Sequence, residues 1–288
     1  MINHPAFSTE AWSVRETRFH VDLLPQTESI FALANGHIGL RGNLDEGEPH
    51  ALSGSYLNGV YELRPASYHE GGYGFPESGQ TVINVINSKL IRLLVNDEPF
   101  DIRYGEVHSH ERELDLRAGV LRRDVRWTSL AGQTVKVSSV RLVSFTQRAI
   151  AAISYEVEAV DLPVRVVVQS ELGANEMVHD QSSDPRVGAV LATPLESEAH
   201  GAEGTSGFLI HHTKVSGLRI GAAMDHRIEG PNETVVEASS QPDNSSISVT
   251  AYLEPGQKLR IIKLIAYGWS GVRSQPAIRD QILSLIHI

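Results

Sequence analysis

A short stretch near the start of the chain holds the residue types that could cradle a phosphate or face a sugar. The sequence SIFALANGHIGLRGNLDEGEP, residues 29–49, contains Gly36, Gly39, Gly42 and Gly47. Each glycine inside a helix costs about 1 kcal/mol, which disfavours a helix here. The Gly-x-x-Gly-x-x-Gly spacing fits neither the dinucleotide fingerprint nor the P-loop, and no Lys-Ser/Thr pair follows it. The spacing therefore favours a bulged, tightly turning segment in which backbones approach closely.

Carboxylates are the second group of residues that could take part in a reaction, because cleavage of a glycosidic bond needs two of them. In inverting enzymes the two carboxyl groups stand about 6.5–9.5 Å apart. The glycine-rich first third of the chain contains five candidates: Asp45, Glu46, Glu62, Glu70 and Glu77. Their spacing distinguishes no pair, and each is interpreted as a solvated loop charge.

Aromatic residues cluster in the segment NGVYELRPASYHEGGYGFPESG, residues 58–79. It contains Tyr61, Tyr68, Tyr73 and Phe75, and Tyr56 stands just before it. Aromatic rings accept the apolar face of a pyranose while nearby polar groups hold its hydroxyls, so the segment is a candidate sugar-stacking surface. The alternative, an aromatic loop that only packs over a sheet, remains open.

Histidines offer a possible metal site. If His108 and His110 lie on one strand they share a face, which is a geometry that zinc sites use. A third ligand is not evident, and the charged surroundings favour a solvated strand edge, so no metal site is predicted. His211 and His212 fall on opposite faces of an extended chain.

Composition excludes several functions. The chain has 288 residues, a formal net charge of -10, a pI of about 5.7 and no cysteine. An acidic surface repels nucleic acid, and the absence of cysteine excludes disulfides and thiol catalysis. No run of 18 apolar residues predicts a membrane span, and the N-terminus has no signal-peptide core. A cytoplasmic protein is the simplest interpretation.

Short β-branched runs between turn residues dominate residues 80–268 and predict the elements that must position these groups. In LRRDVRW, Leu121, Val125 and Trp127 alternate with Arg122, Asp124 and Arg126. This period of two is typical of a strand with one buried face. Turns are predicted at 96–99, 131–132 and 254–257, and residues 194–207 are predicted to be an exposed loop. The fold class is mostly β, a large antiparallel two-sheet β-sandwich.

The C-terminus changes to helical spacing. Ser274 is the expected N-cap and Pro276 lies in the first turn, followed by an apolar stripe of Ile278, Ile282, Leu285 and Ile286. The stripe is predicted to be uncovered in this chain and prone to self-association. We therefore divide the chain into a sandwich domain, residues 1–272, and the start of a linker helix, residues 273–288, of a truncated protein.

The glycine-rich stretch resembles the start of the N-terminal domain of family 65 glycoside phosphorylases and hydrolases. The matching pattern is Ser29-Ile30-Phe31, then Asn35-Gly36-x-Ile38-Gly39-x-Arg41-Gly42, followed by GSYLNGVYE. The segments INVINSKLIRLLVNDEPFDI, ERELDLRAGVLRRDVRW and RLVSFTQRAIAAISYEV follow in the same order as in that family. The resemblance extends to about residue 275.

The resemblance implies a mutarotase-like supersandwich joined by a helical linker to an (α/α)6 barrel. The family acts on maltose, trehalose or kojibiose, and its general-acid glutamate lies in the barrel, so no catalytic residue is expected in this chain. Substrate-proximal candidates are Asn35, Gly36, Arg41, Tyr61 and Glu62, although a structural ion pair is the favoured role of Arg41. Implied partners are the barrel, an α-linked disaccharide and a second copy of the full-length enzyme. Inorganic phosphate is the implied co-substrate of a phosphorylase, with no other cofactor.

Two other classes of function remain open. The chain could be a stand-alone carbohydrate-binding or mutarotase-like sandwich, or a purely structural interaction domain. Burial of the C-terminal stripe on the sandwich itself would favour a self-sufficient module.

Overall fold

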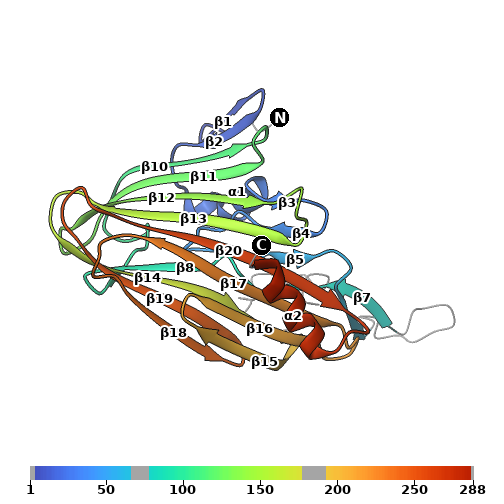
Figure 1. Ribbon diagram of the computed structural model, residues 1–288. Coiled ribbons are helices and arrows are strands. Elements are labelled where there is room, and N and C mark those ends of the chain that lie inside the picture. Colours follow the sequence, from blue (N-terminus) through green and yellow to red (C-terminus); the bar gives the residue numbers. More distant parts are fainter. Residues whose placement is uncertain (1–3, 66–77, 177–192, 287–288) are drawn as a thin grey trace.

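Two antiparallel sheets packed face to face account for most of the chain, as the sequence predicts (Figure 1). The computed structural model describes residues 4–65, 78–176 and 193–286. The larger sheet contains, in spatial order, β1 (Phe7–Glu10), β2 (Ser13–Glu16), β10 (Glu106–Asp115), β11 (Val120–Thr128), β12 (Thr134–Val143), β13 (Ile150–Ala159), β20 (Lys258–Ser270), β17 (Arg219–Glu229), β16 (Ser206–Thr213) and β15 (Leu195–Glu203). The smaller sheet contains β18 (Val235–Gln241), β19 (Asn244–Leu253), β14 (Val164–Gly173), β8 (Ile91–Val95) and β9 (Glu98–Pro99).

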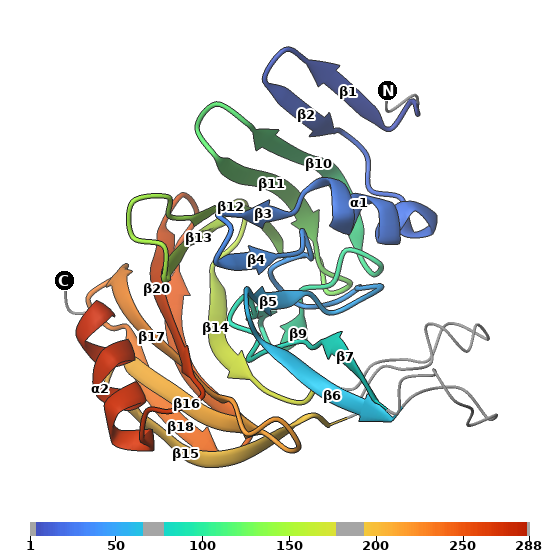
Figure 2. The same cartoon turned by 90° about the vertical axis from the view of Figure 1, so that its right-hand side faces the viewer.

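Smaller elements cover the part of the large sheet that the second sheet does not reach (Figure 2). They are the 3-10 helix η1 (Val21–Leu23), α1 (Leu24–Ile30), the three-stranded sheet β3 (Leu33–Ala34), β4 (Ile38–Leu40) and β5 (Ser55–Leu57), and the hairpin of β6 (Tyr61–Pro65) and β7 (Ser78–Val82). These short strands lie within the glycine-rich third, where the sequence predicts turns. No described helix is long and apolar enough to cross a membrane.

Period-two alternation produces the core between the sheets. In β13, Ile153, Tyr155 and Val157 are fully buried, and they alternate with half-buried residues on the other face. In β11, Leu121, Val125 and Trp127 are buried, as the sequence predicts. The remaining polar residue in the same phase, Arg123, is buried with them, which is the first sign of a polar interior.

The prediction of a loop at 194–207 is wrong. Residues 195–203 form β15, which pairs with β16 through a turn at 204–205. An edge strand needs only backbone hydrogen bonds on one side, so its side chains carry little apolar alternation. The predicted turns at 131–132 and 254–257 are confirmed, and the one at 96–99 is confirmed at residues 96–97 only, because Glu98–Pro99 forms β9.

The predicted uncovered stripe on the C-terminal helix is also wrong. Helix α2 (Gln275–Ile286) begins directly after Ser274 and lies across the outer face of β16, β17 and β20 (Figure 1). Ile278, Ile282 and Ile286 are buried there, and Leu285 is half-buried. The sequence pattern of the helix could not reveal that the large sheet also offers an apolar outer patch.

A pair of glycines makes this packing possible. Gly221 of β17 and Gly268 of β20 are cross-strand partners, and neither has a side chain to hold the helix away. A Cβ atom at Gly221 would stand 2.8 Å from Cγ2 of Ile278, and one at Gly268 would stand 3.0 Å from Cγ2 of Ile282. The helix therefore rests directly on the backbone of the sheet.

Candidate functional site

The glycine-rich stretch leads into a loop of residues 41–54, here called the clamp loop. Gly42 allows its entry, because a Cβ atom there would stand 2.6 Å from Cβ of Phe31. Gly36 lies in the preceding turn with φ of 82°, a left-handed conformation that favours glycine. The interpretation of this stretch as tight turns with close backbone approach is therefore confirmed.

Three buried arginines hold the clamp loop against the large sheet. Arg112 of β10, Arg123 of β11 and Arg141 of β12 are 1–3% exposed, and we call them the arginine row. Arg112 Nη1 donates to the carbonyl of Gly42 at 3.0 Å. Arg141 donates to the carbonyls of Arg41 and Asn43, both at 3.2 Å. The row therefore binds loop backbone as well as side chains.

Two carboxylates of the clamp loop complete this cluster. Asp45 accepts from Arg141 Nη2 at 2.5 Å and from Ser139 Oγ at 2.6 Å. Glu46 accepts from Arg123 Nη1 at 2.7 Å and from the Tyr155 hydroxyl at 2.7 Å. Both side chains are buried, so the prediction of solvated loop charges is wrong for them. Their partners lie about 80–110 positions away in the sequence, and only the fold brings these charges together.

The two neighbouring carboxylates differ in their protonation behaviour. Burial by itself would raise the pKa of Asp45, but the charges of Arg141 and Arg123 outweigh burial and hold that pKa below its usual value. Burial raises the pKa of Glu46, and the Asp45 charge adds to this against the opposing effect of Arg123. Asp45 is therefore the firmly ionised member of the pair.

A second buried group lies at the outer part of the row. Glu16 Oε2 accepts from Arg112 Nε at 2.7 Å and lies 3.2 Å from His110 Nε2. A β-bulge between Val107 and Ser109 places His108 outside the alternation, so it is more exposed than His110. The interpretation that His108 and His110 share one face is therefore wrong. Within the described ranges no three His, Asp or Glu side chains are grouped to hold a metal ion.

Arg41 is the first residue of the clamp loop, and its side chain points toward α1. Its Nη2 donates to the Pro25 carbonyl at 3.1 Å and lies 3.4 Å from Glu28 Oε2. Glu28 is fully buried and also accepts from the backbone N–H groups of Ala51 and Leu52. This contact is the ion pair favoured for Arg41, and Glu28 ties both arms of the loop together.

Asn35 and Gly36 form a turn that is attached to the large sheet. Asn35 Nδ2 donates to the carbonyls of Ser144 and Arg148 at 2.6 and 2.9 Å. Its Oδ1 accepts from the backbone N–H groups of His37 and Ile38. All of these hydrogen bonds join the Asn35 side chain to backbone groups and hold the turn in place. Gly36 beside it is exposed.

Tyr61 and Glu62 meet the turn between β16 and β17. Glu62 is 1% exposed and accepts from the N–H groups of Val215 and Ser216 at 3.0 and 2.8 Å. Burial alone would raise the pKa of Glu62, but these backbone donors outweigh it and lower that pKa. The prediction of a solvated charge is therefore wrong for Glu62 also. Tyr61 is 39% exposed and is the candidate ring that solvent reaches.

Four of the five candidates lie at one end of the large sheet. We call this end the turn edge; it comprises the turns at 11–12, 116–119, 144–149, 214–218 and 271–274. Each of these turns exposes one large apolar side chain, and the set is Trp12, Leu116, Phe145, Val215 and Val272. At the opposite end, Tyr104, Leu130 and Leu162 are exposed, whereas the turns at 204–205, 230–234 and 254–257 expose no large apolar side chain. Asn35, Gly36, Tyr61 and Glu62 contact or adjoin the turn edge, whereas Arg41 lies beside α1.

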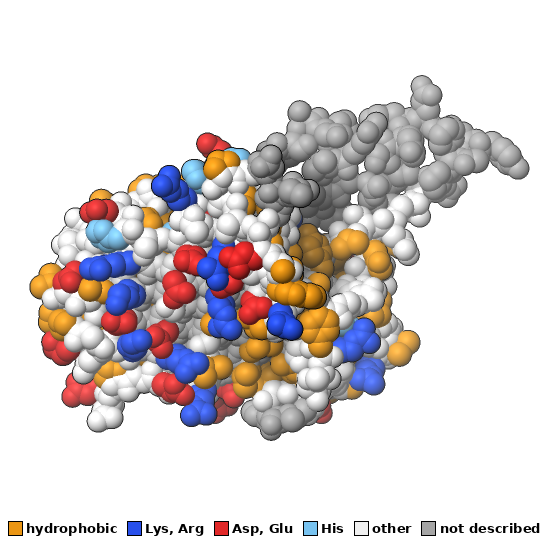
Figure 3. Space-filling model, turned by 90° about the horizontal axis from the view of Figure 1, so that it is seen from above, with side chains coloured by type: hydrophobic (Ala, Val, Ile, Leu, Met, Phe, Trp, Pro, Cys, Tyr) orange, Lys and Arg blue, Asp and Glu red, His pale blue; other side chains and the backbone are white. Residues whose placement is uncertain are grey.

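Sequence reasoning did not find the arginine row or Glu28. One signal was available, because Arg123 shares the buried phase of Leu121 and Val125 in β11. The remaining sequence-predicted groups, Tyr68, Glu70, Tyr73, Phe75 and Glu77, lie outside the described residues. The face shown in Figure 3 carries basic and acidic side chains interspersed, without a continuous basic patch that would suit a phosphate backbone.

This chain is a large two-sheet β-sandwich domain, and buried arginines of the large sheet hold its glycine-rich loop against that sheet. Residues 14–286 match the family model described as glycosyl hydrolase family 65, N-terminal domain, and the chain belongs to this family. Its structure resembles a solved structure provisionally assigned as a kojibiose phosphorylase from the human microbiome, with a TM-score of 0.86. The match covers 98% of this chain and 36% of that chain at 22% identity, so it bears on the fold alone.

Relatives of known length are much longer than this chain. It is 55% identical over 287 residues to an uncharacterized glycosyl hydrolase of Mycobacterium tuberculosis, covering 100% of this chain and 36% of the relative. It is 34% identical over 268 residues to the alpha,alpha-trehalose phosphorylase of Thermoanaerobacter brockii, covering 91% and 35% respectively. The chain therefore spans about a third of the length of these relatives.

The buried histidines predict a loss of stability in acid. Burial, followed by the charge of Lys263, lowers the pKa of His226 from 6.5 to about 4. As the pH falls, His226 therefore takes up its proton in the unfolded chain before it does so in the folded chain. The contribution of neutral His226 to the unfolding free energy is complete above pH 6.5 and is lost as the pH falls to about 4. We expect His226 to account for a loss on the order of 3 kcal/mol in unfolding free energy across this range.

Urea unfolding at several pH values between 7 and 4 measures this effect. The variant His226→Gln should show a shallower decline of unfolding free energy with falling pH. The matched control His108→Gln alters an exposed histidine and should keep the original slope. An unchanged slope in His226→Gln would contradict the assignment.

Proposed function

We propose that this chain is the non-catalytic N-terminal sandwich of a disaccharide phosphorylase or hydrolase acting on α-glucosides such as maltose, trehalose or kojibiose. The observation that carries the proposal is its 34% identity to a trehalose phosphorylase over 91% of the chain. In the proposed enzyme a separate (α/α)6 barrel supplies the general acid. Inorganic phosphate is the co-substrate if the enzyme is a phosphorylase, and the domain supports the barrel and shapes the mouth of its active site.

The state of the described carboxylates supports a non-catalytic role. Asp45, Glu46 and Glu62 are all buried and held by arginine, tyrosine or backbone donors. A general acid needs access to the glycosidic oxygen within hydrogen-bond distance. Carboxylates locked inside the sandwich instead serve to fix loops.

We expect the purified 288-residue chain to be inactive toward maltose, trehalose and kojibiose. The assay measures glucose 1-phosphate release in phosphate buffer and glucose release without phosphate. The positive control is the same assay on a protein that includes the sequence encoded after codon 288, which we expect to be active. Release of glucose 1-phosphate by the isolated chain above a phosphate-free control would refute the proposal.

The turn edge is the surface proposed to meet the barrel. It carries five exposed apolar side chains on consecutive turns, against three, Tyr104, Leu130 and Leu162, at the opposite end. In the full-length protein we expect Trp12 and Phe145 to be protected from hydroxyl-radical labelling relative to the isolated chain. Leu130, which is 79% exposed at the opposite end, is the internal control and should label equally in both. Equal labelling of Phe145 in both proteins would place the barrel elsewhere.

A stand-alone carbohydrate-binding or mutarotase-like module is the second candidate function. It is favoured by the burial of Ile278 and Ile282 on the sandwich itself, because the helix needs no further cover to satisfy its apolar stripe. The coding sequence after codon 288 separates the two candidates, since only the first requires a barrel there.

A further inference from the structure

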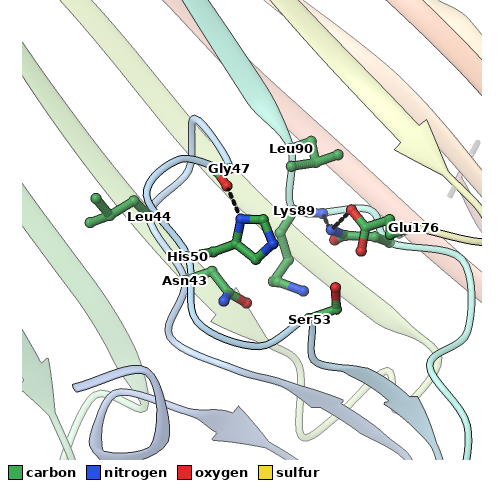
Figure 4. Close-up of a pocket in the computed structure, with 9 residues that line it drawn as sticks. Asn43, Leu44, Gly47, His50, Ser53, Lys89, Leu90 and Glu176 are labelled. Atoms are coloured by element: carbon green, nitrogen blue, oxygen red, sulfur yellow. Dashed lines mark hydrogen bonds between the residues drawn. The ribbon is translucent and has the colours of Figure 1, made fainter. Parts of the chain in front are cut away.

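A small pocket lies between the clamp loop and the segment that leads into β8 (Figure 4). It encloses about 30 Å³ and is lined mainly by hydrogen-bonding side chains. Asn43, His50 and Ser53 come from the clamp loop, and Lys89 comes from the opposite wall. None of the roles described above uses the groups that face this space.

The amine of Lys89 is buried without a carboxylate partner among the described residues. Its side chain is 1% exposed, and Nζ donates to the Gly54 carbonyl at 3.0 Å and to Ser55 Oγ at 2.7 Å. An ammonium group has three N–H donors, so one remains for the pocket. Figure 4 shows this amine between the side chains of Asn43 and Ser53.

Asn43 supplies the complementary acceptor. Its Nδ2 donates to the Leu52 carbonyl at 2.9 Å, which fixes the orientation of the amide. Its Oδ1 is buried and has no hydrogen-bond partner among the described residues. A buried carbonyl oxygen left unpaired is destabilising, so this atom calls for a donor in the pocket.

The remaining lining makes the pocket electrically balanced. Glu176, which accepts from Asn87 Nδ2 at 2.7 Å, offsets the charge of Lys89. Leu44 and Leu90 add an apolar wall. The pocket therefore offers one donor from Lys89, one acceptor from Asn43 and an apolar wall, with no excess charge. These features match a ligand group that carries both a hydroxyl and C–H surface.

We propose that this pocket binds the hydroxymethyl arm of a neutral monosaccharide or polyol. The hydroxyl accepts from Lys89 and donates to Asn43 Oδ1, while its carbon contacts the leucine wall. The small volume admits one such arm rather than a whole ring. Burial lowers the pKa of Lys89 to about 7, and the contact described here belongs to the ammonium form, whose third N–H donates to the hydroxyl while the hydroxyl proton goes to Asn43 Oδ1.

Glucose and xylose are the discriminating probes, because xylopyranose is the same ring without the hydroxymethyl group. NMR of protein labelled with 15N-asparagine follows the side-chain amide of Asn43 during titration of the full chain. We expect a saturable shift with glucose and with glycerol, with dissociation constants on the order of 1–100 mM for so small a buried group. Xylose should produce no saturable shift.

A matched pair of variants ties the signal to the pocket. Ser53→Ala removes a lining hydroxyl and should weaken glucose binding about three- to tenfold. Ser284→Ala removes an exposed hydroxyl on α2 and should leave binding unchanged.

Three outcomes overturn the proposal. The first is no saturable shift with glucose, which means that the pocket holds water only. The second is an equal response to xylose or in Ser53→Ala. The third is saturable binding of inorganic phosphate in place of glucose, which would make the pocket an anion site. All of these outcomes are independent of the activity and labelling tests of the proposed function.

Discussion

Replacing Arg141 with methionine is expected to lower the unfolding free energy by about 3–5 kcal/mol. The change leaves Asp45 buried without its closest cation and removes the donors to the carbonyls of Arg41 and Asn43. Removing one partner of a buried pair is strongly destabilising, and Asp45 then keeps only Arg123, whose Nη1 lies 3.6 Å from Asp45 Oδ2. A loss of this size is a large part of the 5–15 kcal/mol that stabilises a typical domain.

Urea unfolding monitored by circular dichroism measures this loss. The matched control is Arg227→Met, because the Arg227 side chain is 76% exposed and should change stability by less than about 0.5 kcal/mol. The double variant Asp45→Leu with Arg141→Met should recover part of the loss, since no lone charge is then buried. If Arg141→Met proves as stable as Arg227→Met, the arginine row does not hold the clamp loop.

The second large effect concerns the docking of α2. Replacing Ile282 with glutamate is expected to cost several kcal/mol, because the fully buried side chain lies against Gly221 and Gly268. A carboxylate at this position must either be desolvated or force the helix off the sheet. Adding Ile286→Glu should extend the loss, since Ile286 is buried in the same small cluster.

Ser284→Glu is the matched control, since it places the same charge on the exposed side of the same helix. It should leave the melting temperature nearly unchanged. Gly221→Val tests the contact from the sheet side, where a Cβ atom would stand 2.8 Å from Ile278. Wild-type melting of both Ile282→Glu and Gly221→Val would mean that the helix does not pack as described.

The tertiary contacts explain why several local predictions failed. The carboxylates at 45, 46 and 62 stand in a polar, glycine-bearing sequence that reads as solvated loop. Their burial follows from donors on distant strands and turns, and no local pattern encodes that pairing. The bulge at His108 is similar, because one extra residue reverses a period-two assignment without altering the composition of the strand.

Some features of the site candidates could be predicted from the local sequence, and others depend on tertiary contacts. The turn at Asn35 and Gly36 was readable, because an Asn-Gly pair tolerates the left-handed backbone that the turn adopts. An ion pair was the favoured role of Arg41, but its partner, Glu28, became visible only in the fold. The gathering of Tyr61 and Glu62 against the turn at 214–218 depends on a contact across more than 150 residues.

The sequence by itself determined the β-sandwich class, the main turns and the presence of a C-terminal helix. These features follow from local physics: period-two burial, the backbone preferences of glycine, asparagine and proline, and the spacing of isoleucines. Only the tertiary structure decided which charges are buried, which face covers α2 and how the pocket at Lys89 is assembled. Each of these depends on desolvation and packing between segments far apart in the chain, and those energies have no counterpart in a local pattern.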